Sequence, residues 1–486
     1  MASASPAGPK GALLLDYRQH PYRSLAVVFG VWKAFLLGIA TLATLAGPAY
    51  DTSGDLLDAI ATNASADALP GHAIPSGGIV SRFVSWDAIY YVQAARRGHL
   101  YEQEWAFGAA LPTVVSFLQR MLASLGLDLP MPVVAVAYAH VAHLLAVLLL
   151  YRLGCQLWLG AAGRTVAFVA ACLHVLSPAG LFLSAPYAEG SCALFSFAGY
   201  IAFAAGRKAE PAASGAGLSL KGDLLRLLAG VYFGVATLFR SNGLLNGIVF
   251  AYEAVVGSFA FVRQPSLPLF RRLVFVGLGG LSVAAGSVVP QTLAYLQFCM
   301  APSGVPGEEL RPWCTTRLPS IYNFVQDHYW GSGRLFGYWT LSNLPLFLLA
   351  TPMLLVMGKS SIDMWTSVAS AAQEAKNKSA KAARTEEEEE EEEEEEAGAS
   401  TVLDPRLTTL VQCMAAIQIL LAVMAFTSYH VQIVTRISSA YPVWYWWLVQ
   451  GLVGGTRAKL SGGLVVFMVM YASIQGILFA SFLPPA

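Results

Sequence analysis

Residues 131–151 read MPVVAVAYAHVAHLLAVLLLY, a run of 21 residues without a single Asp, Glu, Lys or Arg. A helix needs about 20 apolar residues to cross the roughly 30 Å hydrocarbon core of a bilayer, so this run predicts a transmembrane helix. Ten more stretches on either side of it have a similar character. Together they predict eleven spans, at about residues 24–47, 131–151, 165–184, 187–206, 224–239, 243–262, 273–297, 340–357, 407–427, 441–455 and 462–482.

The composition of the whole chain supports this interpretation. Of the 486 residues, 56% are apolar and only 12% are charged, whereas soluble domains carry about 25% charged residues. Thirty basic and thirty acidic residues cancel, so the net charge gives no indication of a nucleic-acid partner. A cytosolic enzyme, a secreted disulfide scaffold and a disordered chain are excluded. The predicted fold class is an all-α polytopic membrane protein.

An odd number of spans places the two termini on opposite sides of the membrane. Cytosolic loops of membrane proteins carry an excess of Lys and Arg, which decides the orientation. With residues 1–23 in the cytosol, twenty basic residues fall on the cytosolic side and nine on the other. We therefore predict a cytosolic N-terminus and a C-terminus on the opposite side.

The loops on the two sides differ in character. The longest cytosolic loop, residues 358–406, holds eleven consecutive glutamates, and because like charges repel and stay solvated, it predicts a disordered, low-complexity insert. The non-cytosolic loops at 48–130, 298–339 and 428–440 are instead rich in Trp, Tyr, His, Asp and Arg. Aromatic and charged residues gathered on one face indicate a site there. The first of these loops also carries an N-glycosylation motif at Asn63.

The first non-cytosolic loop contains the sequence SWDAIYY at residues 85–91. Its pattern predicts a short amphipathic helix at the membrane surface. Asp87 stands at the start of this helix and has two interpretations, an N-cap that accepts backbone hydrogen bonds or a catalytic carboxylate. Glu102 and Glu104 are rival carboxylates in the same loop.

Two charged residues interrupt apolar sequence on the same side of the membrane. Glu189 begins a predicted span inside its apolar boundary, where a carboxylate is costly and is by default a functional candidate. The alternative is a charge that favours the dipole at the start of a helix. Arg240, in the sequence RSNG, either extends to the interface or binds a phosphate group.

Two further segments combine aromatic side chains with His, Gln and Arg. They read IYNFVQDHYW at residues 321–330 and HVQIVTR at residues 430–436. An aromatic belt at the membrane interface explains Tyr and Trp, but it does not explain the other three residue types. Aromatic faces stack on sugar rings, and arginine pairs with phosphate oxygens. The pattern predicts an enzyme or transporter that acts on a polar head group at the non-cytosolic surface.

In combination, these motifs resemble the GPI mannosyltransferase 2 family, which is called PIG-V in animals. The matches occur in the family's order between about residues 24 and 482, so they cover the whole chain except the Glu-rich insert. One departure is FGAALP at residues 107–112, where we expect a bulkier, aromatic-rich stretch in the family. The matching motifs lie within residues 86–107, 177–189, 240–243, 312–330, 343–345 and 430–436.

The resemblance implies a GT-C-type glycosyltransferase of the endoplasmic reticulum membrane, with about eleven transmembrane helices and lumenal loops that carry short amphipathic helices. It implies a single membrane-embedded domain made of residues 1–357 and 407–486. Such an enzyme adds the second mannose, through an α-1,6 bond, from dolichyl phosphate mannose to the GPI anchor precursor. Its partners would be membrane lipids and these two glycolipids, and an auxiliary membrane subunit is left open. No nucleic acid is expected.

The implied reaction assigns roles to residues. A β-linked donor that gives an α product requires inversion, so one carboxylate acts as general base, and its place in the motif assigns this role to Asp87. Relatives that use this donor generally work without a metal, so we expect neither a metal nor a cofactor. The residues assigned to the donor phosphate and sugar are Arg436, Arg240, His328, His430 and Gln432. Those assigned to positioning the donor or acceptor are Trp86, Glu189, Tyr187, Asn242, Gln326, Tyr329 and Trp330.

The main alternatives are a lipid-sugar transporter or flippase with a lumen-facing site, and a non-catalytic subunit of the GPI pathway. The Trp-Asp pair at residues 86–87 favours the enzyme, because a flippase does not need a carboxylate at the start of a lumenal helix. Purified membranes that transfer labelled mannose would discriminate between the two.

A disulfide is expected in the second of the three non-cytosolic loops. Cys299 and Cys314 are the only two cysteines that share such a loop, and the lumen of the endoplasmic reticulum oxidises thiols. The bond would hold the segment that follows it over the site.

Overall fold

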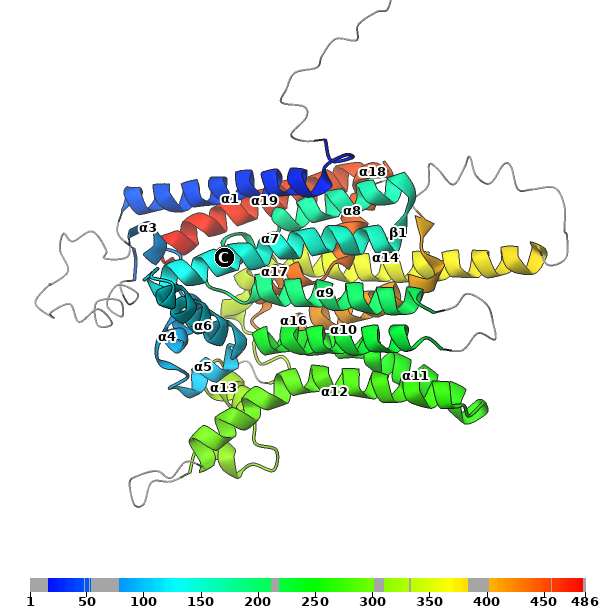
Figure 1. The fold of residues 1–486 in the computed structure, drawn as a ribbon. Coiled ribbons are helices and arrows are strands. Elements are labelled where there is room, and N and C mark those ends of the chain that lie inside the picture. Colours follow the sequence, from blue (N-terminus) through cyan, green and yellow to red (C-terminus); the bar gives the residue numbers. More distant parts are fainter. Residues whose placement is uncertain are drawn as a thin grey trace, which may run out of the picture.

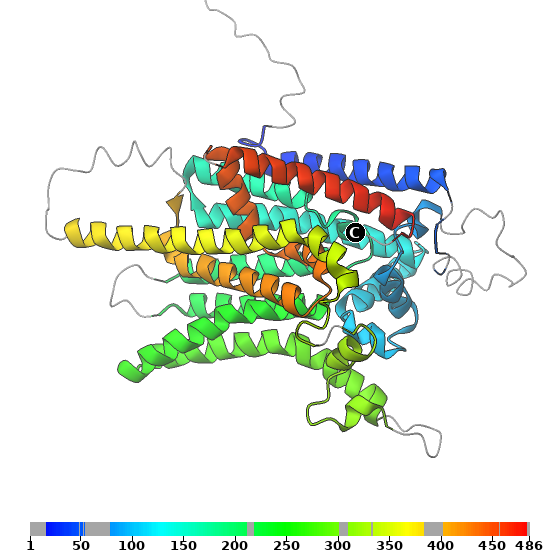
Figure 2. The same ribbon diagram turned by 180° about the vertical axis from the view of Figure 1, so that it is seen from behind.

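A computed structural model shows the chain as an almost entirely helical bundle (Figure 1). It describes residues 16–47, 49–51, 53, 78–210, 218–300, 310–331, 334–382, 402–455 and 457–483. The long helices run side by side, and the short helices between them gather at one end, as the reverse view in Figure 2 also shows. We call this end, which carries residues 78–124 and 310–331, the site end, and the opposite one the far end.

Each of the eleven predicted spans overlaps a helix, although the count of eleven membrane crossings stays a prediction. Eight helical segments among the described residues are long and apolar enough to cross a membrane. The expected class, an all-α polytopic membrane protein, is therefore confirmed. The helices that coincide with the predicted spans are α1 (Pro21–Ala46), α7 (Met131–Leu157), α8 (Gly160–Val175), α9 (Glu189–Lys208), α10 (Leu220–Phe239), α11 (Gly247–Arg263), α12 (Leu267–Tyr295), α14 (Leu344–Ala382), α16 (Thr408–Thr427), α18 (Val443–Val453) and α19 (Ala458–Ala480).

Two predicted spans are only partly helical. The α-helix within the span predicted at 165–184 ends at Val175, and α18, in the span predicted at 441–455, has 11 residues. Pro178 and Pro186 explain the first case, because proline lacks the amide that a continuing helix needs. A hydropathy window does not detect such an interruption, since it registers apolar residues whatever their backbone conformation.

The irregular backbone that replaces these helical turns is buried inside the protein. Residues 176–188 contain the short 3₁₀ helix η2 (Gly180–Leu183), in which Leu181 and Phe182 are almost fully buried. A second irregular stretch, with the short helix α17 (Val434–Ile437), occupies residues 428–442, almost all of it in the predicted loop before α18. Non-helical backbone is tolerated at membrane depth only where protein or a cavity surrounds it. These two segments therefore mark the functional region of the bundle.

The predicted disordered insert is shorter than expected. Helix α14 continues to Ala382, and Val402–Leu403 form β2, which pairs antiparallel with β1 (Trp158–Leu159). The prediction was therefore wrong for residues 358–382 and 402–403. The physical reason is that Ala and Lys, which supply nine of the nineteen residues between 364 and 382, are strong helix formers. The run of glutamates lies outside the described residues.

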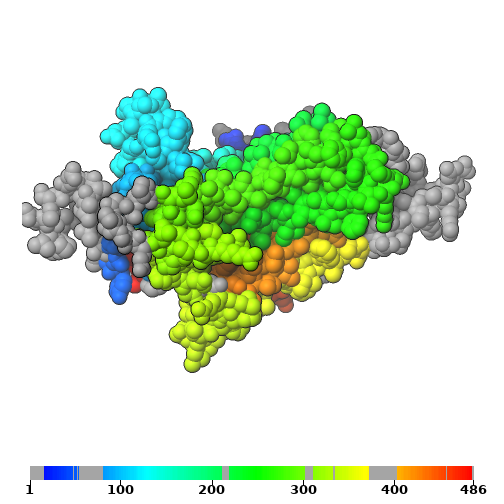
Figure 3. Space-filling model, turned by 90° about the horizontal axis from the view of Figure 1, so that it is seen from below, coloured from blue at the N-terminus to red at the C-terminus, as the bar shows by residue number. Residues whose placement is uncertain are grey.

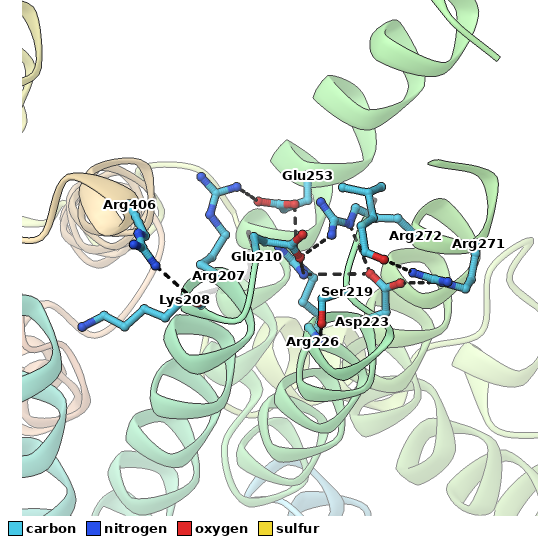
Figure 4. Close-up of polar contacts among 12 residues, drawn as sticks. Arg207, Lys208, Glu210, Ser219, Asp223, Arg226, Glu253, Arg271, Arg272 and Arg406 are labelled. Carbon is cyan, nitrogen blue, oxygen red and sulfur yellow. Dashed lines mark hydrogen bonds and ion pairs between the residues drawn. The ribbon is translucent and has the colours of Figure 1, made fainter. Parts of the chain in front are cut away.

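At the far end, a group of ion pairs fastens several helices together (Figure 4). Asp223 accepts from Arg271 at 2.8 Å and from Arg272 at 3.2 Å. Glu210, just after α9, pairs with Arg226 at 2.9 Å and also with Arg272. Burial raises the pKa of Glu210, but the two arginines lower it more, so its pKa lies below the ordinary value. This group joins α9, α10 and α12 at the end away from the short helices.

At the site end, α4 (Asp87–Arg97), α5 (Glu102–Ala106), α6 (Ala110–Ser124) and α13 (Ile321–His328) pack on the ends of the long helices. The space-filling view in Figure 3 shows the segment around residues 310–340 gathered at one end of the bundle. Cys299 and Cys314 form a disulfide, with Cα atoms 5.6 Å apart. This is the pair expected from the sequence.

Candidate active site

Four charged side chains from distant parts of the chain meet near the site end. Asp87 and Glu189 are the first residues of α4 and α9, Arg240 follows α10, and Arg436 lies in α17. Arg436 Nη1 donates to Asp87 Oδ2 at 3.2 Å, and its Nη2 lies 2.9 Å from Glu189 Oε1. Arg240 Nη1 donates to the same Glu189 oxygen at 2.7 Å. We call these four residues the charged row, because negative and positive groups alternate along it.

The charged row runs from a half-buried end to a deeply buried centre. The side chain of Asp87 is 34% exposed, whereas that of Glu189 is 0% exposed. The guanidinium of Arg436 lies over the rings of Phe182, at 4.2 Å, and Tyr187, at 4.7 Å. Because Glu189 and the two guanidiniums are largely removed from solvent, the electrostatic interactions among them are stronger than on an open surface. Asp87 is the one carboxylate in the row that a ligand can reach without rearrangement.

The backbone before Asp87 has an unusual conformation. Trp86 has a φ of 59°, in a region that bulky residues rarely adopt and that costs about 1–3 kcal/mol. Trp86 is the N-cap of α4, and its side chain makes no capping hydrogen bond. Asp87 is the next residue, and the partner that the structure gives its carboxylate is Arg436. The N-cap interpretation of Asp87 is therefore wrong, and the strain at Trp86 aims the carboxylate at the cavity described next.

A cavity of about 400 Å³ opens beside the charged row. It is bounded by irregular segments, helix ends and α13, which explains why aromatic and polar side chains share its wall. Tyr441, just behind it, contacts Asn242 through both its side-chain amide, at 3.0 Å, and its backbone carbonyl, at 3.2 Å, and so fixes the RSNG turn. Ten of the residues assigned from the sequence line the cavity: Trp86, Asp87, Tyr187, Arg240, Asn242, Gln326, Trp330, His430, Gln432 and Arg436.

The other predicted site residues lie elsewhere. Glu189 stands behind the two arginines that it binds. His328 is exposed and stacks on Phe324 with ring centroids 5.0 Å apart, and Tyr329 donates to Glu102 at 3.2 Å. The assignments of His328 and Tyr329 to the site are thus not supported by the geometry.

Helix periodicity explains this correction. On α13 and just after it, Tyr322, Gln326 and Trp330 recur every four residues and line the cavity together. His328, two residues from Gln326, falls on the opposite side of the same helix. Asn63, the predicted glycosylation site, lies outside the described residues.

The two rival carboxylates have structural roles. Glu102 is buried and accepts hydrogen bonds from Trp313 Nε1, at 2.8 Å, and from the hydroxyl of Tyr329. Glu104 is buried as well, pairs with Arg97 at 2.6 Å and caps the start of α5 through two backbone amides. Neither lines the cavity. Glu102 instead ties α5 to the segment that follows the disulfide.

Burial sets the charge of the histidine in the cavity wall. Desolvation lowers the pKa of His430 below its ordinary value, and the nearby Asp87 opposes this only in part. A neutral imidazole donates or accepts a hydrogen bond but supplies no positive charge. The positive charge available to a ligand in this cavity therefore comes from Arg240 and Arg436.

Sequence reasoning missed several residues of the cavity wall. Phe182 and Gln475 lie within apolar stretches and look like ordinary membrane-helix content. Thr435 lies inside the recognised motif at residues 430–436 and Tyr429 directly precedes it, so their positions offered a signal. Gln475 offered a signal of a different kind, because a polar side chain within a membrane helix is costly and often functional. Among the described residues, no group of three or more His, Cys, Asp or Glu side chains is placed to hold a metal ion.

The fold and this cavity define a polytopic membrane protein with a charged, aromatic-lined site at one end of its helix bundle. The chain belongs to the mannosyltransferase (PIG-V) family, which it matches over residues 50–486. The family expected from the sequence motifs is thereby confirmed, and the protein is a mannosyltransferase by family.

Relatives of similar length support this assignment. The chain is 49% identical to GPI mannosyltransferase 2 of Chaetomium globosum, over 96% of this chain and 97% of that protein. It is 43% identical to GPI mannosyltransferase 2 of Gibberella zeae, over 97% and 100%. It is 33% identical to GPI alpha-1,6-mannosyltransferase 2 of Mus musculus, over 61% and 62%.

Among solved structures, the oligosaccharyltransferase of Archaeoglobus fulgidus is similar at 12% identity and a TM-score of 0.37. The match covers 96% of this chain and 55% of that chain. The present chain thus spans about half the length of the archaeal protein.

Proposed function

We propose that this protein transfers the second mannose, in α-1,6 linkage, from dolichyl phosphate mannose to the GPI anchor precursor, as a GT-C-type enzyme that inverts the anomeric configuration. The observation that carries the proposal is the charged row at the edge of an aromatic-lined cavity. In this row the partly exposed carboxylate of Asp87 lies 3.2 Å from the guanidinium of Arg436, which packs on two aromatic rings. The names of the family and of its relatives supply the reaction.

Asp87 is the general base in this proposal. Its carboxylate takes the proton of the acceptor's primary hydroxyl while the oxygen of that hydroxyl bonds to C1 of mannose. The bond between C1 and the phosphate oxygen breaks, and its electron pair leaves with dolichyl phosphate. A positioned general base contributes about 10²–10⁴ in rate. Asp87 lines the cavity, which is the first requirement for this role.

The two arginines stabilise the leaving phosphate. Dolichyl phosphate gains negative charge as the bond to C1 breaks, and fixed cations in a water-poor site stabilise such charge effectively. Arg240 and Arg436 both line the cavity. Glu189 binds both and is a positioning residue, because it holds the two guanidiniums without lining the cavity itself.

The orientation completes the proposal. The site end faces the lumen of the endoplasmic reticulum, the N-terminus lies in the cytosol and the C-terminus lies in the lumen. Helix α1 starts toward the far end and α19 finishes at the site end (Figure 1), in agreement with an odd number of crossings. The ion pairs of Figure 4 then lie on the cytosolic side, where the basic loops were counted.

The test is direct transfer in vitro. Membranes from cells that lack the endogenous enzyme and express this chain are given dolichyl phosphate [³H]mannose and a one-mannose GPI precursor. We expect a labelled two-mannose product that an α-1,6-specific mannosidase cleaves. Binding of both glycolipids without any transfer would refute the proposal and favour a transporter.

A further inference from the structure

The cavity has a second polar wall, different from the charged row. Gln475 lies on α19, is 1% exposed and lines the cavity. Its amide oxygen has no hydrogen-bond partner among the described residues, whereas its amide group is hydrogen-bonded to the hydroxyl of Tyr471 on the same helix. Gln432 Oε1 and Trp86 Nε1, from two other cavity-lining residues, are also buried without a partner. We call Trp86, Gln432 and Gln475 the neutral wall.

An unpaired amide oxygen in a membrane helix is costly, because neither water nor lipid satisfies it. Gln418 on α16 shows how this chain treats a glutamine whose role is structural. Its amide nitrogen donates to the carbonyl of Met357, at 3.0 Å, and to Ser360 and Ser361, and its oxygen accepts from the backbone of Trp444 at 3.1 Å. Gln475 is as deeply buried, but among the described residues its amide oxygen has no partner, so this oxygen is available to a ligand.

The position of Gln475 is set by close backbone packing. Gly180, in η2, has a φ of +47°, and a Cβ at this residue would stand 3.0 Å from Gln475 Oε1 and 3.1 Å from the backbone of Ala472. Tyr471, one turn earlier on α19, is hydrogen-bonded to Gln475, and its hydroxyl lies 3.4 Å from the hydroxyl of Thr435 in α17. The Gln475 side chain is therefore confined against η2, with Tyr471 as its neighbour on the same helix.

The chemistry of the unpaired atoms identifies the ligand. The neutral wall offers two acceptors, the oxygens of Gln432 and Gln475, and one donor, the Trp86 indole. A phosphate has only acceptors at its oxygens and would be repelled by the two amide oxygens. A hydroxyl group both donates and accepts, and so matches this mixed set.

We propose that Gln475, together with Gln432 and Trp86, binds hydroxyl groups of a hexose and thereby determines which sugar the enzyme accepts. This inference rests on the function proposed above. It divides the cavity into a cationic wall for the phosphate and a neutral wall for a sugar ring. A site built to hydrogen-bond a hydroxyl discriminates strongly against a substrate that lacks it, because its own buried groups are then left unpaired.

The test combines a variant with altered substrates. Gln475→Leu and Gln475→Met are compared with the unaltered enzyme on dolichyl phosphate mannose and on donors that carry 2-, 3-, 4- or 6-deoxymannose. A parallel set uses acceptors whose first mannose lacks the 2-, 3- or 4-hydroxyl. We expect the unaltered enzyme to lose about ten- to a hundredfold in kcat/KM on one analogue. Both variants should show a similar loss on the normal substrate and no further loss on that analogue.

The analogue on which the variants show no further loss identifies the sugar at the neutral wall. A donor analogue indicates the donor sugar, and an acceptor analogue indicates the acceptor sugar. Gln418→Leu is the matched control, since it should lower the thermal stability in detergent while the response to all analogues stays that of the unaltered enzyme.

The inference is overturned if Gln475→Leu and Gln475→Met keep normal kcat/KM, or if they lose activity but respond to every deoxy analogue as the unaltered enzyme does. Gln432→Met is measured in parallel. If it also keeps normal kcat/KM, or also responds to every deoxy analogue as the unaltered enzyme does, the neutral wall does not bind a sugar. If the unaltered enzyme transfers no mannose at all, it is the proposed function that fails.

Discussion

Replacing Asp87 by Asn separates the chemistry of the charged row from its contribution to stability. The side chain of Asp87 is 34% exposed and makes one ion pair, at 3.2 Å from Arg436. After allowance for screening by solvent, such a pair contributes about 1 kcal/mol or less to folding. Asn has nearly the same size, and its amide oxygen can still accept a hydrogen bond from Arg436. The variant should therefore fold normally and lose about 10²–10⁴ in transfer rate, because it cannot accept the hydroxyl proton.

Glu189→Gln provides the contrast within the same row. Glu189 is fully buried and binds both arginines, at 2.7 and 2.9 Å. Its neutralisation leaves two guanidiniums without their shared carboxylate, and breaking a buried pair costs about 3–5 kcal/mol. We expect this variant to accumulate at a low level, whereas Asp87→Asn accumulates normally.

The assay uses cells that lack the endogenous enzyme and express each variant at a low level. GPI-anchored proteins at the cell surface are measured by flow cytometry, expression by immunoblot, and mannose transfer in isolated membranes. A normal transfer rate for Asp87→Asn would refute its assignment as general base. A normal level of folded Glu189→Gln would refute the stability reasoning.

Three more outcomes follow from contacts outside the charged row. Lys33, buried in α1, donates to the carbonyl of Leu183 at 3.0 Å and to the hydroxyl of Ser184 at 2.7 Å, just before α9. Lys33→Met should lower both the thermal stability in detergent and the transfer per folded molecule. Glu102→Gln and Glu104→Gln should retain transfer in the membrane assay, since neither lines the cavity, although both should unfold at a lower temperature. Cys314→Ser removes a cross-link between residues 15 positions apart and should cost about 3 kcal/mol of stability, seen as faster proteolysis of residues 310–331 in detergent-permeabilised microsomes.

The hydropathy of the sequence determined the class of the protein and the approximate place of every long helix. This succeeds because a bilayer requires each span to satisfy its backbone internally and to present apolar side chains, so that spans are visible locally. The motif around Asp87 also stood out locally, since charged and aromatic residues are conspicuous in an apolar chain. The spans at 165–184 and 441–455 show where such local reasoning ends. Apolar residues inside a protein need not be helical, and only packing against neighbouring segments reveals this.

The pairing within the site was decided by the tertiary structure alone. Asp87 and Arg436 are 349 positions apart, and no local pattern links them. The place of His328 has a local cause, because a helix directs neighbouring residues to different sides, but only the tertiary structure shows which side of α13 faces the cavity. Gln475 is the converse case, since the sequence presents it as one polar residue in an apolar helix. Close packing of the η2 backbone against α19 is what buries Gln475 beside the cavity. The tertiary structure therefore decides which of its polar atoms are left without partners, and these are the atoms that can bind a ligand.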